Sequence, residues 1–214
     1  MDVKTPPIII AGCGPGSPDY LTPAARKAIA DAEVLVGAGR LLELFPGHGG
    51  EKIVVGADIE KVLGQIDSRL GRGRIAVLVT GDPGLCSLAR PVLKRFGRTA
   101  CRVIPGISSV QAAFAGIGVD WRDARIIDAH GNDPHMTPAS LVNEGKIAVF
   151  AGRSEAIRWV AGLVKAIGEG RRIYLCENLT LDEERIRQVQ PADLEKIEAS
   201  SRSIVLIIRE ELLS

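Results

Sequence analysis

The chain has little of what usually marks a specialised class of protein. Only 4% of its 214 residues are aromatic, and its four cysteines include no C-x-x-C pair. There is no apolar run of about 18 residues or more, and the short N-terminal apolar stretch is interrupted by Asp2 and Lys4. Lys and Arg (27) nearly balance Asp and Glu (26), whereas non-specific nucleic-acid binding favours a strongly basic balance. We therefore expect no membrane span, no signal peptide and no nucleic-acid partner.

The small number of cysteines and their spacing also bear on metal binding and on the cellular compartment. The cysteines are Cys13, Cys86, Cys101 and Cys176. They mostly lie in or beside apolar segments, which is typical of buried free thiols in a reducing compartment, and we expect a cytoplasmic protein. His130 and His135 share one short loop with Asp133, but no third-ligand pattern accompanies them, so we expect no metal site.

The first half of the chain alternates β-branched runs with helix patterns. Strands are expected at 8–10, 34–36, 53–55, 75–79 and 102–104, and helices from Thr22-Pro23 onward and at about 38–45, 58–70 and 87–97. The strand runs are almost continuously apolar, as in parallel strands that are buried on both faces. This series predicts an α/β domain with a mostly parallel sheet.

A second α/β domain is expected after a helix at 108–118. The polar stretch VDWRD at 119–123 is the candidate boundary, which gives domains at 1–118 and 119–214. The second half has strands at 125–127, 147–150, 173–175 and 203–208, a helix at about 154–168, and charged helical pieces near 182–187 and 191–198. We expect a cleft between the two domains, because interdomain clefts are common ligand sites.

Three loops rich in glycine and proline follow predicted strands. They read GCGPGSPD at 12–19, TGDPG at 80–84 and IPGISS at 104–109. Open parallel sheets bind ligands at the carboxyl ends of their strands. The first loop does not fit the dinucleotide fingerprint, because Ser17 occupies the place of the third glycine. It is also a poor nest for an anion, because Pro15 lacks a backbone N–H. Each loop alone could be an ordinary turn, and only their order and spacing together are specific.

These loops resemble the tetrapyrrole methylases, which are class III S-adenosylmethionine-dependent methyltransferases. The matching segments are GCGPGSPDYLTPAARKAI (12–29), VTGDPGLCSLARPVL (79–93), VIPGISSVQAAFAGIG (103–118), DARIIDAHG (123–131) and ENLTLDEERI (177–186). They cover essentially the whole chain in order. The forms GPGSPDYLT, GISSVQAAFA and ENLT are most similar to the branch that methylates C5 of a precorrin or cobalt-precorrin in cobalamin biosynthesis. The resemblance implies a stand-alone C5-methylating enzyme with the two-domain α/β fold of the family.

The resemblance also implies the cofactor, S-adenosylmethionine, and the residues that contact it. These are Gly81, Asp82, Leu85, Ser108, Ser109, Phe150, Ala151, Glu177, Asn178 and Leu179. Pro15, Gly16 and Ser17 of the first loop should face the tetrapyrrole. Asp82 has two open roles, since its carboxylate could meet the ammonium group of the cofactor or cap its own turn. A sulfonium cofactor needs no P-loop lysine, and none of the three loops contains one.

The sequence leaves open which group acts as the general base. Some members of the family carry Asp directly after the first Gly-Pro-Gly, where this chain has Ser17, so the nearest acid is Asp19. His130 is the other candidate, at the end of a predicted strand, and substrate or water could also take the proton. Relatives often read His-Gly-Arg there, whereas this chain has Asn132 in place of the Arg.

A polycarboxylate ring favours arginine partners. Arg40, Arg122 and Arg153 lie at predicted loop or helix-start positions and are candidate substrate contacts, although each could be a solvated surface charge.

Partners and alternatives follow from the same resemblance. It implies a homodimer and the possibility of association with a separate C15-methylating decarboxylase.

Alternative functions are methylation of another ring carbon, a diphthine-type methylase acting on a protein, and a subunit that binds S-adenosylmethionine without turnover. A class I methyltransferase would place an acid at the end of its second strand, but VLVGAG at 34–39 has none.

Overall fold

The computed structural model describes residues 7–198 and 200–213, and the chain divides into two compact units, Met1–Ser108 and Ser109–Ser214. The division falls before the expected boundary at 118/119. The helix at 109–116 contacts a strand of the second sheet, so it belongs to the second unit. Burial of its apolar side chains there outweighs the polar sequence signal at 119–123.

The first unit is built on a five-stranded sheet in the order β3-β2-β4-β1-β5, with every neighbouring pair parallel. Its strands are β1 (Ile8–Gly12), β2 (Val34–Gly37), β3 (Glu51–Val54), β4 (Ile75–Val79) and β5 (Cys101–Ile104). The helices are η1 (Pro18–Tyr20), α1 (Pro23–Ala30), α2 (Gly39–Leu42), α3 (Ile59–Asp67) and α4 (Ala89–Phe96). The predicted βαβα series and its parallel sheet are confirmed.

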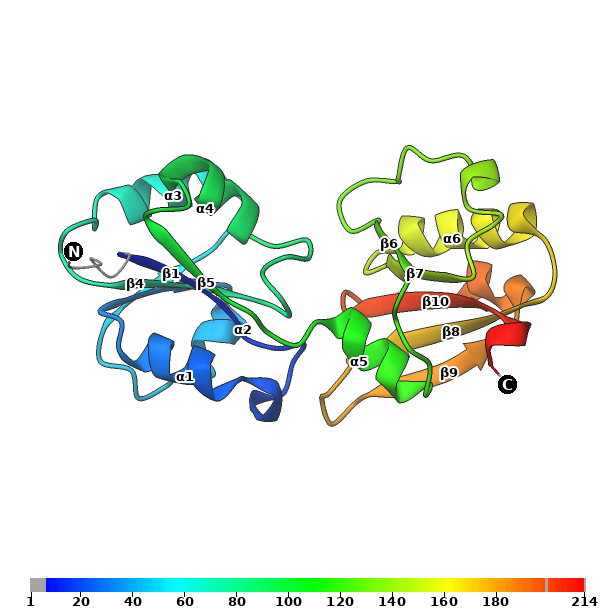
Figure 1. Ribbon diagram of the computed structural model, residues 1–214, viewed down its shortest axis with the longest axis horizontal. Coiled ribbons are helices and arrows are strands. Elements are labelled where there is room, and N and C mark those ends of the chain that lie inside the picture. The colour runs from blue at the N-terminus through cyan, green and yellow to red at the C-terminus, as the bar shows by residue number, and fades with distance from the viewer. Residues whose placement is uncertain (1–6, 199, 214) are drawn as a thin grey trace. The chain divides into compact units, whose positions relative to one another are not determined.

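Helices cover both faces of this sheet (Figure 1). Ile8 and Ile10 of β1 pack with residues of α3 and α4, whereas Ile9 and Ala11 pack with residues of α1 and α2. Successive residues of a strand point to opposite faces, so the uninterrupted apolar runs are explained by burial on both sides. As the sequence suggests, α1 begins with Thr22 as its cap, whose Oγ1 accepts the Ala25 N–H at 3.1 Å.

The second unit has a mixed sheet in the order β6-β7-β10-β8-β9. β6 and β7 are parallel, and the other neighbouring pairs are antiparallel. Its strands are β6 (Arg125–Asp128), β7 (Lys146–Phe150), β8 (Arg171–Glu177), β9 (Arg185–Val189) and β10 (Ser203–Arg209). Its helices are α5 (Ser109–Gly116), η2 (Pro138–Ser140), α6 (Ser154–Ile167), η3 (Pro191–Lys196) and η4 (Glu210–Leu212). One face of the sheet packs against α6 and η3, and β10 also contacts α5.

One predicted element of the second unit is wrong. The charged stretch at 182–187 was expected to be helical, but β9 begins at Arg185 and pairs with β8 as a hairpin. Its alternating exposed side chains carry charges, which also suit a helix, so a pattern of charge alone could not separate the two. The other charged piece forms η3, a short 3-10 helix.

The cysteines only partly follow expectation. Cys13, Cys101 and Cys176 are buried free thiols, but Cys86 is exposed because it lies in the loop after β4. None of the helices within 7–198 and 200–213 is long and apolar enough to cross a bilayer.

Candidate functional site

The three glycine-proline loops of the first unit meet at the carboxyl edge of its sheet. The N–H of Cys13 donates to the carbonyl oxygen of Val79 at 2.9 Å, and the N–H of Gly81 donates to that of Gly14 at 2.8 Å. Gly14 and Gly81 thereby form an antiparallel bridge beyond the ends of β1 and β4. The predicted juxtaposition of these loops therefore holds within the unit.

Gly12, Gly81 and Gly106 touch through their backbones. A Cβ built on Gly12 would lie 2.6 Å from the Gly106 nitrogen, and one built on Gly106 would lie 2.3 Å from the Gly81 carbonyl oxygen. Gly81 also has a φ of +65°, which side chains disfavour. Only glycine permits this approach of three loops, so the glycines that attract notice in the sequence have a steric reason.

Asp82 ties two of these loops together. Its Oδ1 accepts the N–H of Gly84 at 2.7 Å, and its Oδ2 accepts the N–H of Gly106 at 3.1 Å. Each carboxylate oxygen thus has a backbone partner. Of its two open roles, the structure supports the capping role and adds a link to the loop after β5.

The other predicted residues of the first unit lie around this edge. Ser17 caps η1 by accepting the N–H of Asp19 at 3.2 Å, and the Asp19 side chain is exposed. Arg40 donates from Nη2 to the Oγ1 of Thr80 at 2.6 Å, directly beside the Gly-Asp-Pro loop. Thr80 was not predicted, because nothing in its sequence position shows that α2 reaches it. The remaining residues are Pro15 (buried), Gly16 and Leu85 (half-buried), Ser108 (buried) and Ser109 (half-buried).

Cys13 lies within the same edge but is not a nucleophile near neutral pH. Burial raises the pKa of its thiol to about 12, against smaller lowering effects of the Val79 backbone and of the Arg40 charge.

The predicted residues of the second unit form a group of their own at one edge of the mixed sheet. In the strand register Asp128 lies opposite Phe150, Phe150 opposite Ile204, and Ser203 opposite Glu177. The loops that follow are joined by backbone bonds: Ala129 N to Phe150 O (3.2 Å), Ala151 N to Ser203 O (2.9 Å) and Asn178 N to Arg202 O (3.3 Å). His130, Phe150, Ala151, Arg153, Glu177 and Asn178 therefore belong to one edge.

Arg153 organises the loop that carries His130. Its Nε donates to the Ala129 carbonyl oxygen at 2.9 Å, and its Nη2 pairs with Asp133. The imidazole of His130 is exposed and lies edge-on to Phe150, with ring centroids 6.2 Å apart. Arg153 thus has a positioning role, which the sequence did not predict.

Arg122 lies elsewhere in the second unit. It precedes β6, so it is at the opposite edge of the sheet from the loops after β6 and β7. Its side chain is 87% exposed and pairs with the equally exposed Asp123 at 3.5 Å. Within the second unit, the structure therefore does not bring Arg122 together with the other predicted residues.

The turn after β8 is the most strained part of this edge. Asn178 and Thr180 have φ values of +50° and +68°, and for a β-branched residue such as Thr this is an outlier. The N–H of Thr180 donates to Glu184 Oε2 at 2.6 Å, which helps to hold the turn. Leu179 lies between them and is buried. Backbone strain of this kind concentrates at ligand sites.

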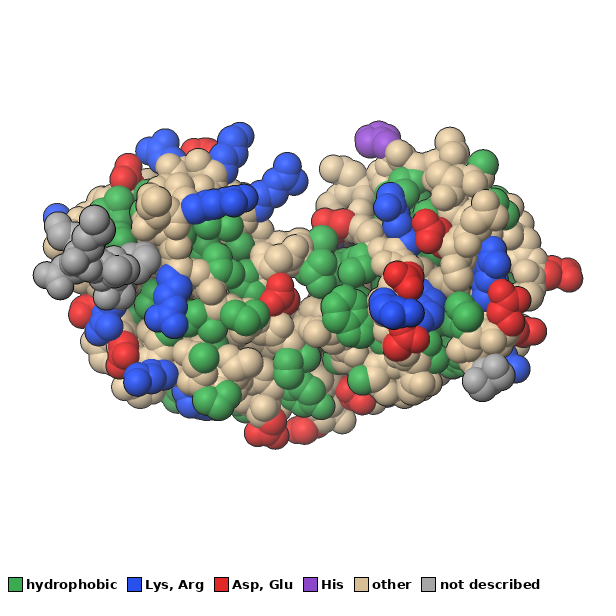
Figure 2. Space-filling model, in the orientation of Figure 1, with side chains coloured by type: hydrophobic (Ala, Val, Ile, Leu, Met, Phe, Trp, Pro, Cys, Tyr) green, Lys and Arg blue, Asp and Glu red, His purple; other side chains and the backbone are tan. Residues whose placement is uncertain are grey.

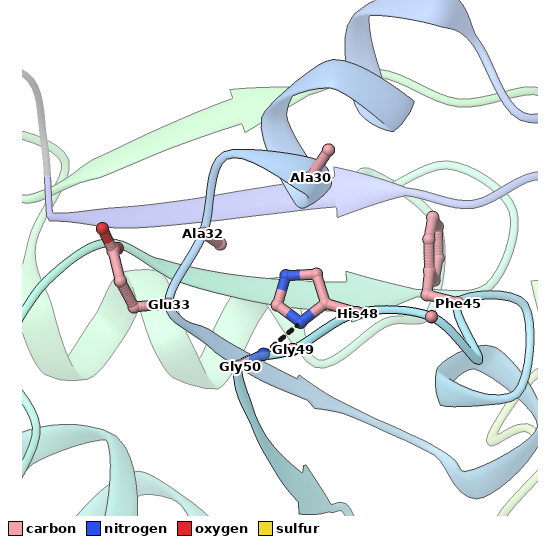
Figure 3. A pocket seen from close by; sticks show the side chains of 8 residues that line it. Ala30, Ala32, Glu33, Phe45, His48, Gly49 and Gly50 are labelled. Atoms are coloured by element: carbon pink, nitrogen blue, oxygen red, sulfur yellow. Dashed lines mark hydrogen bonds between the residues drawn. The ribbon is translucent and has the colours of Figure 1, made fainter.

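A separate pocket of about 670 Å³ lies at the amino edge of the first sheet (Figure 3). It is lined by Ala30, Ala32, Glu33, Phe45, Gly47, His48, Gly49 and Gly50. His48 is fixed there because its Nδ1 accepts the Gly50 N–H at 3.1 Å. None of the predicted site residues lines this pocket, so it is distinct from the carboxyl-edge group. Within 7–198 and 200–213 no group of three or more His, Cys, Asp or Glu side chains could hold a metal ion.

The chain is similar to known proteins over most of its length. The family profile of the Tetrapyrrole (Corrin/Porphyrin) Methylases matches residues 7–195. The cobalt-precorrin-7 C(5)-methyltransferase of Salmonella typhimurium is 36% identical over 180 residues, which cover 84% of this chain and 88% of that protein. The crystal structure of the precorrin-6Y methylase of Archaeoglobus fulgidus is 26% identical, with a TM-score of 0.70, over 95% of this chain and 97% of that one.

One further solved structure is similar in fold alone. The uroporphyrin-III C-methyl transferase of Thermus thermophilus, solved in complex with S-adenosyl homocysteine, is 19% identical, with a TM-score of 0.75, over 94% of this chain and 91% of that one.

Proposed function

Because this chain belongs to the tetrapyrrole (corrin/porphyrin) methylases, we propose that it is an S-adenosylmethionine-dependent methyltransferase acting at C5 of a cobalt-precorrin in cobalamin biosynthesis. One observation carries the proposal: the Salmonella relative, named for this reaction, is 36% identical over 84% of the chain. This match spans 84% of the chain and 88% of the relative, so it includes residues of both units.

The carboxyl-edge loops of the first unit fit the proposed cofactor. When bound, S-adenosylmethionine supplies a methyl group already activated by a positive sulfur. Its amino-acid part and adenine need backbone N–H and C=O groups and an apolar surface. The contacts among Gly12, Gly81 and Gly106 hold the three loops against one another at this edge. Gly81, Asp82, Leu85, Ser108 and Ser109 are the proposed contacts in this unit.

The edge of the second unit is proposed to supply Phe150, Ala151, Glu177, Asn178 and Leu179. The half-buried Phe150 offers apolar surface for a ring such as adenine, Leu179 packs beneath the turn, and Asn178 offers an amide. Their common placement at one sheet edge supports their acting together.

The residues nearest the first loop are proposed to bind the tetrapyrrole. Arg40 is held beside the loop by Thr80, and its guanidinium suits a carboxylate. Pro15, Gly16 and Ser17 would face the ring. Asp19 and His130 remain the proposed candidates for removing the ring proton, because both are exposed at the edges that carry the loops.

The charge of the first unit suits a polycarboxylate. Residues 83–119 contain no Asp or Glu, whereas Arg90, Lys94, Arg95, Arg98 and Arg102 all lie there. Lys and Arg side chains gather over the part of this unit that carries α3 and α4 (Figure 2). Such a field attracts an anionic ring before contact is made.

Titration calorimetry with S-adenosylhomocysteine tests the cofactor half of the proposal. Wild type should bind with micromolar affinity, and the double variant Ser108→Ala/Ser109→Ala should bind more weakly. A folded wild-type protein that gives no heat of binding would refute the proposed cofactor.

We extend the proposal to a cytoplasmic homodimer that works alongside a separate C15-methylating decarboxylase. The support is the family resemblance alone. Light scattering on the purified protein would measure the mass, and a monomer of 22.8 kDa at micromolar concentration would refute the dimer.

A further inference from the structure

Glu177 stands apart from every other charged residue that the structure describes. Among residues 7–198 and 200–213 it is the only Asp, Glu, Lys, Arg or His that is buried, with 9% of its surface exposed. Moving a carboxylate out of water is unfavourable unless the charge is well paired. Its presence at a sheet edge therefore calls for a compensating partner or a role.

The compensation that the chain provides is weak. The hydrogen bond recorded for the Glu177 carboxylate is with Arg187 Nη2, at 3.4 Å, and the Arg187 side chain is 50% exposed. Some exposed ion pairs are closer, for example Lys165 with Glu195 at 2.6 Å. The buried carboxylate of Glu177 is thus paired at a longer distance than these exposed carboxylates, although burial makes a close partner more valuable to it.

The surroundings of Glu177 point to a ligand. Glu177 ends β8, lies opposite Ser203 of β10, and is followed by the strained turn with positive φ at Asn178 and Thr180. The edge is shared with Phe150 and Ala151. An incompletely paired carboxylate beside a strained turn is typical of a functional site.

We propose that Glu177 distinguishes the methyl donor from the spent cofactor by charge. The inference rests on the proposed function and deepens it. S-Adenosylmethionine carries a positive sulfonium, and S-adenosylhomocysteine has a neutral sulfur but is otherwise the same molecule. A carboxylate in a poorly solvated edge attracts the sulfonium form more strongly, because screening by water is reduced there. Arg187 weakens this attraction, because its positive charge partly neutralises the Glu177 carboxylate.

Paired titrations test the inference with both ligands on each protein. Glu177→Gln keeps the shape and removes the charge, so the preference for S-adenosylmethionine over S-adenosylhomocysteine should fall about tenfold. Arg187→Gln leaves the carboxylate unpaired, so the preference should rise severalfold. Glu183→Gln is the matched control: it makes the same change of charge in the same hairpin, at an exposed side chain, and should shift the preference less than twofold.

If Glu177 and Arg187 were only a structural pair, each variant would weaken the binding of both ligands alike and leave the preference unchanged. The inference instead predicts that the preference falls in Glu177→Gln and rises in Arg187→Gln. The inference is overturned if wild type binds both ligands and Glu177→Gln leaves their ratio unchanged. It is also overturned if both variants move the ratio in one direction. Should Glu177→Gln fail to fold, Arg187→Gln decides alone, and an unchanged or lower ratio refutes the inference. Failure of wild type to bind either ligand would instead remove the proposed function and the inference with it.

Discussion

Replacing Asp82 should loosen the loops of the first unit. Its carboxylate accepts two backbone N–H groups, from Gly84 at 2.7 Å and from Gly106 at 3.1 Å. Hydrogen bonds to a charged group contribute about 1.5–3 kcal/mol each, and since Asp82 is only half-buried the lower figure applies. Asp82→Ala removes both bonds and should cost about 3 kcal/mol. Asp82→Asn keeps one acceptor oxygen and should cost about 1.5 kcal/mol.

The assay is urea unfolding followed by titration with S-adenosylhomocysteine. Stability should fall in the order wild type, Asp82→Asn, Asp82→Ala, and affinity for the ligand should fall in the same order, because a displaced loop at Gly106 no longer presents its backbone. Asp58→Asn is a suitable control. Asp58 caps α3 through the Lys61 N–H at 3.0 Å, and Asn caps about as well, so the loss should be only a few tenths of a kcal/mol.

Two results would refute this reasoning. Asp82→Ala could unfold like wild type, which would show that the two bonds contribute nothing. Alternatively, Asp82→Asn could keep full stability and lose ligand binding, which would mean that the carboxylate contacts the cofactor directly and does not act through the loops.

Three further predictions follow from the same unit and its thiols. Gly106→Ala should lower stability by about 3 kcal/mol in urea unfolding, because its Cβ would lie 2.3 Å from the Gly81 carbonyl oxygen; stability equal to wild type would contradict this. Stability should fall as pH rises above about 9, because unfolded thiols ionise there, while the folded pKa values of Cys13 and Cys176 are about 12; Cys176→Ala should lessen the fall. A thiol reagent should label Cys86 quickly in the folded protein and Cys13 only on unfolding, as mass spectrometry of digests would show.

Much of the first unit could be predicted because its signals are local. Continuous apolar runs fix the buried parallel strands, and Thr22-Pro23 marks a helix start whose cap the structure confirms. The placement of the loops at one sheet edge could be predicted from the parallel order of the strands alone. The tight approach of Gly12 to Gly106 could not be predicted, because it depends on how three loops pack in space.

Predictions for the second unit failed where pattern and packing diverge. The stretch at 182–187 is charged enough for a helix, but pairing with β8 makes Arg185 and Arg187 part of a strand. The boundary moved because α5 buries its apolar side chains against β10, a contact between segments far apart in sequence. The burial of Glu177 could not be foreseen for the same reason, since a strand-end Glu is usually exposed.

The most direct test of the central claim follows the methyl group itself. The protein would be incubated with cobalt-precorrin-7 and S-adenosylmethionine labelled with ¹³C in its methyl group, and the product ring examined by NMR. The account predicts one new labelled methyl group bonded to C5, dependent on the enzyme. A labelled methyl at another ring carbon, or no transfer by a protein shown to bind S-adenosylhomocysteine, would contradict it.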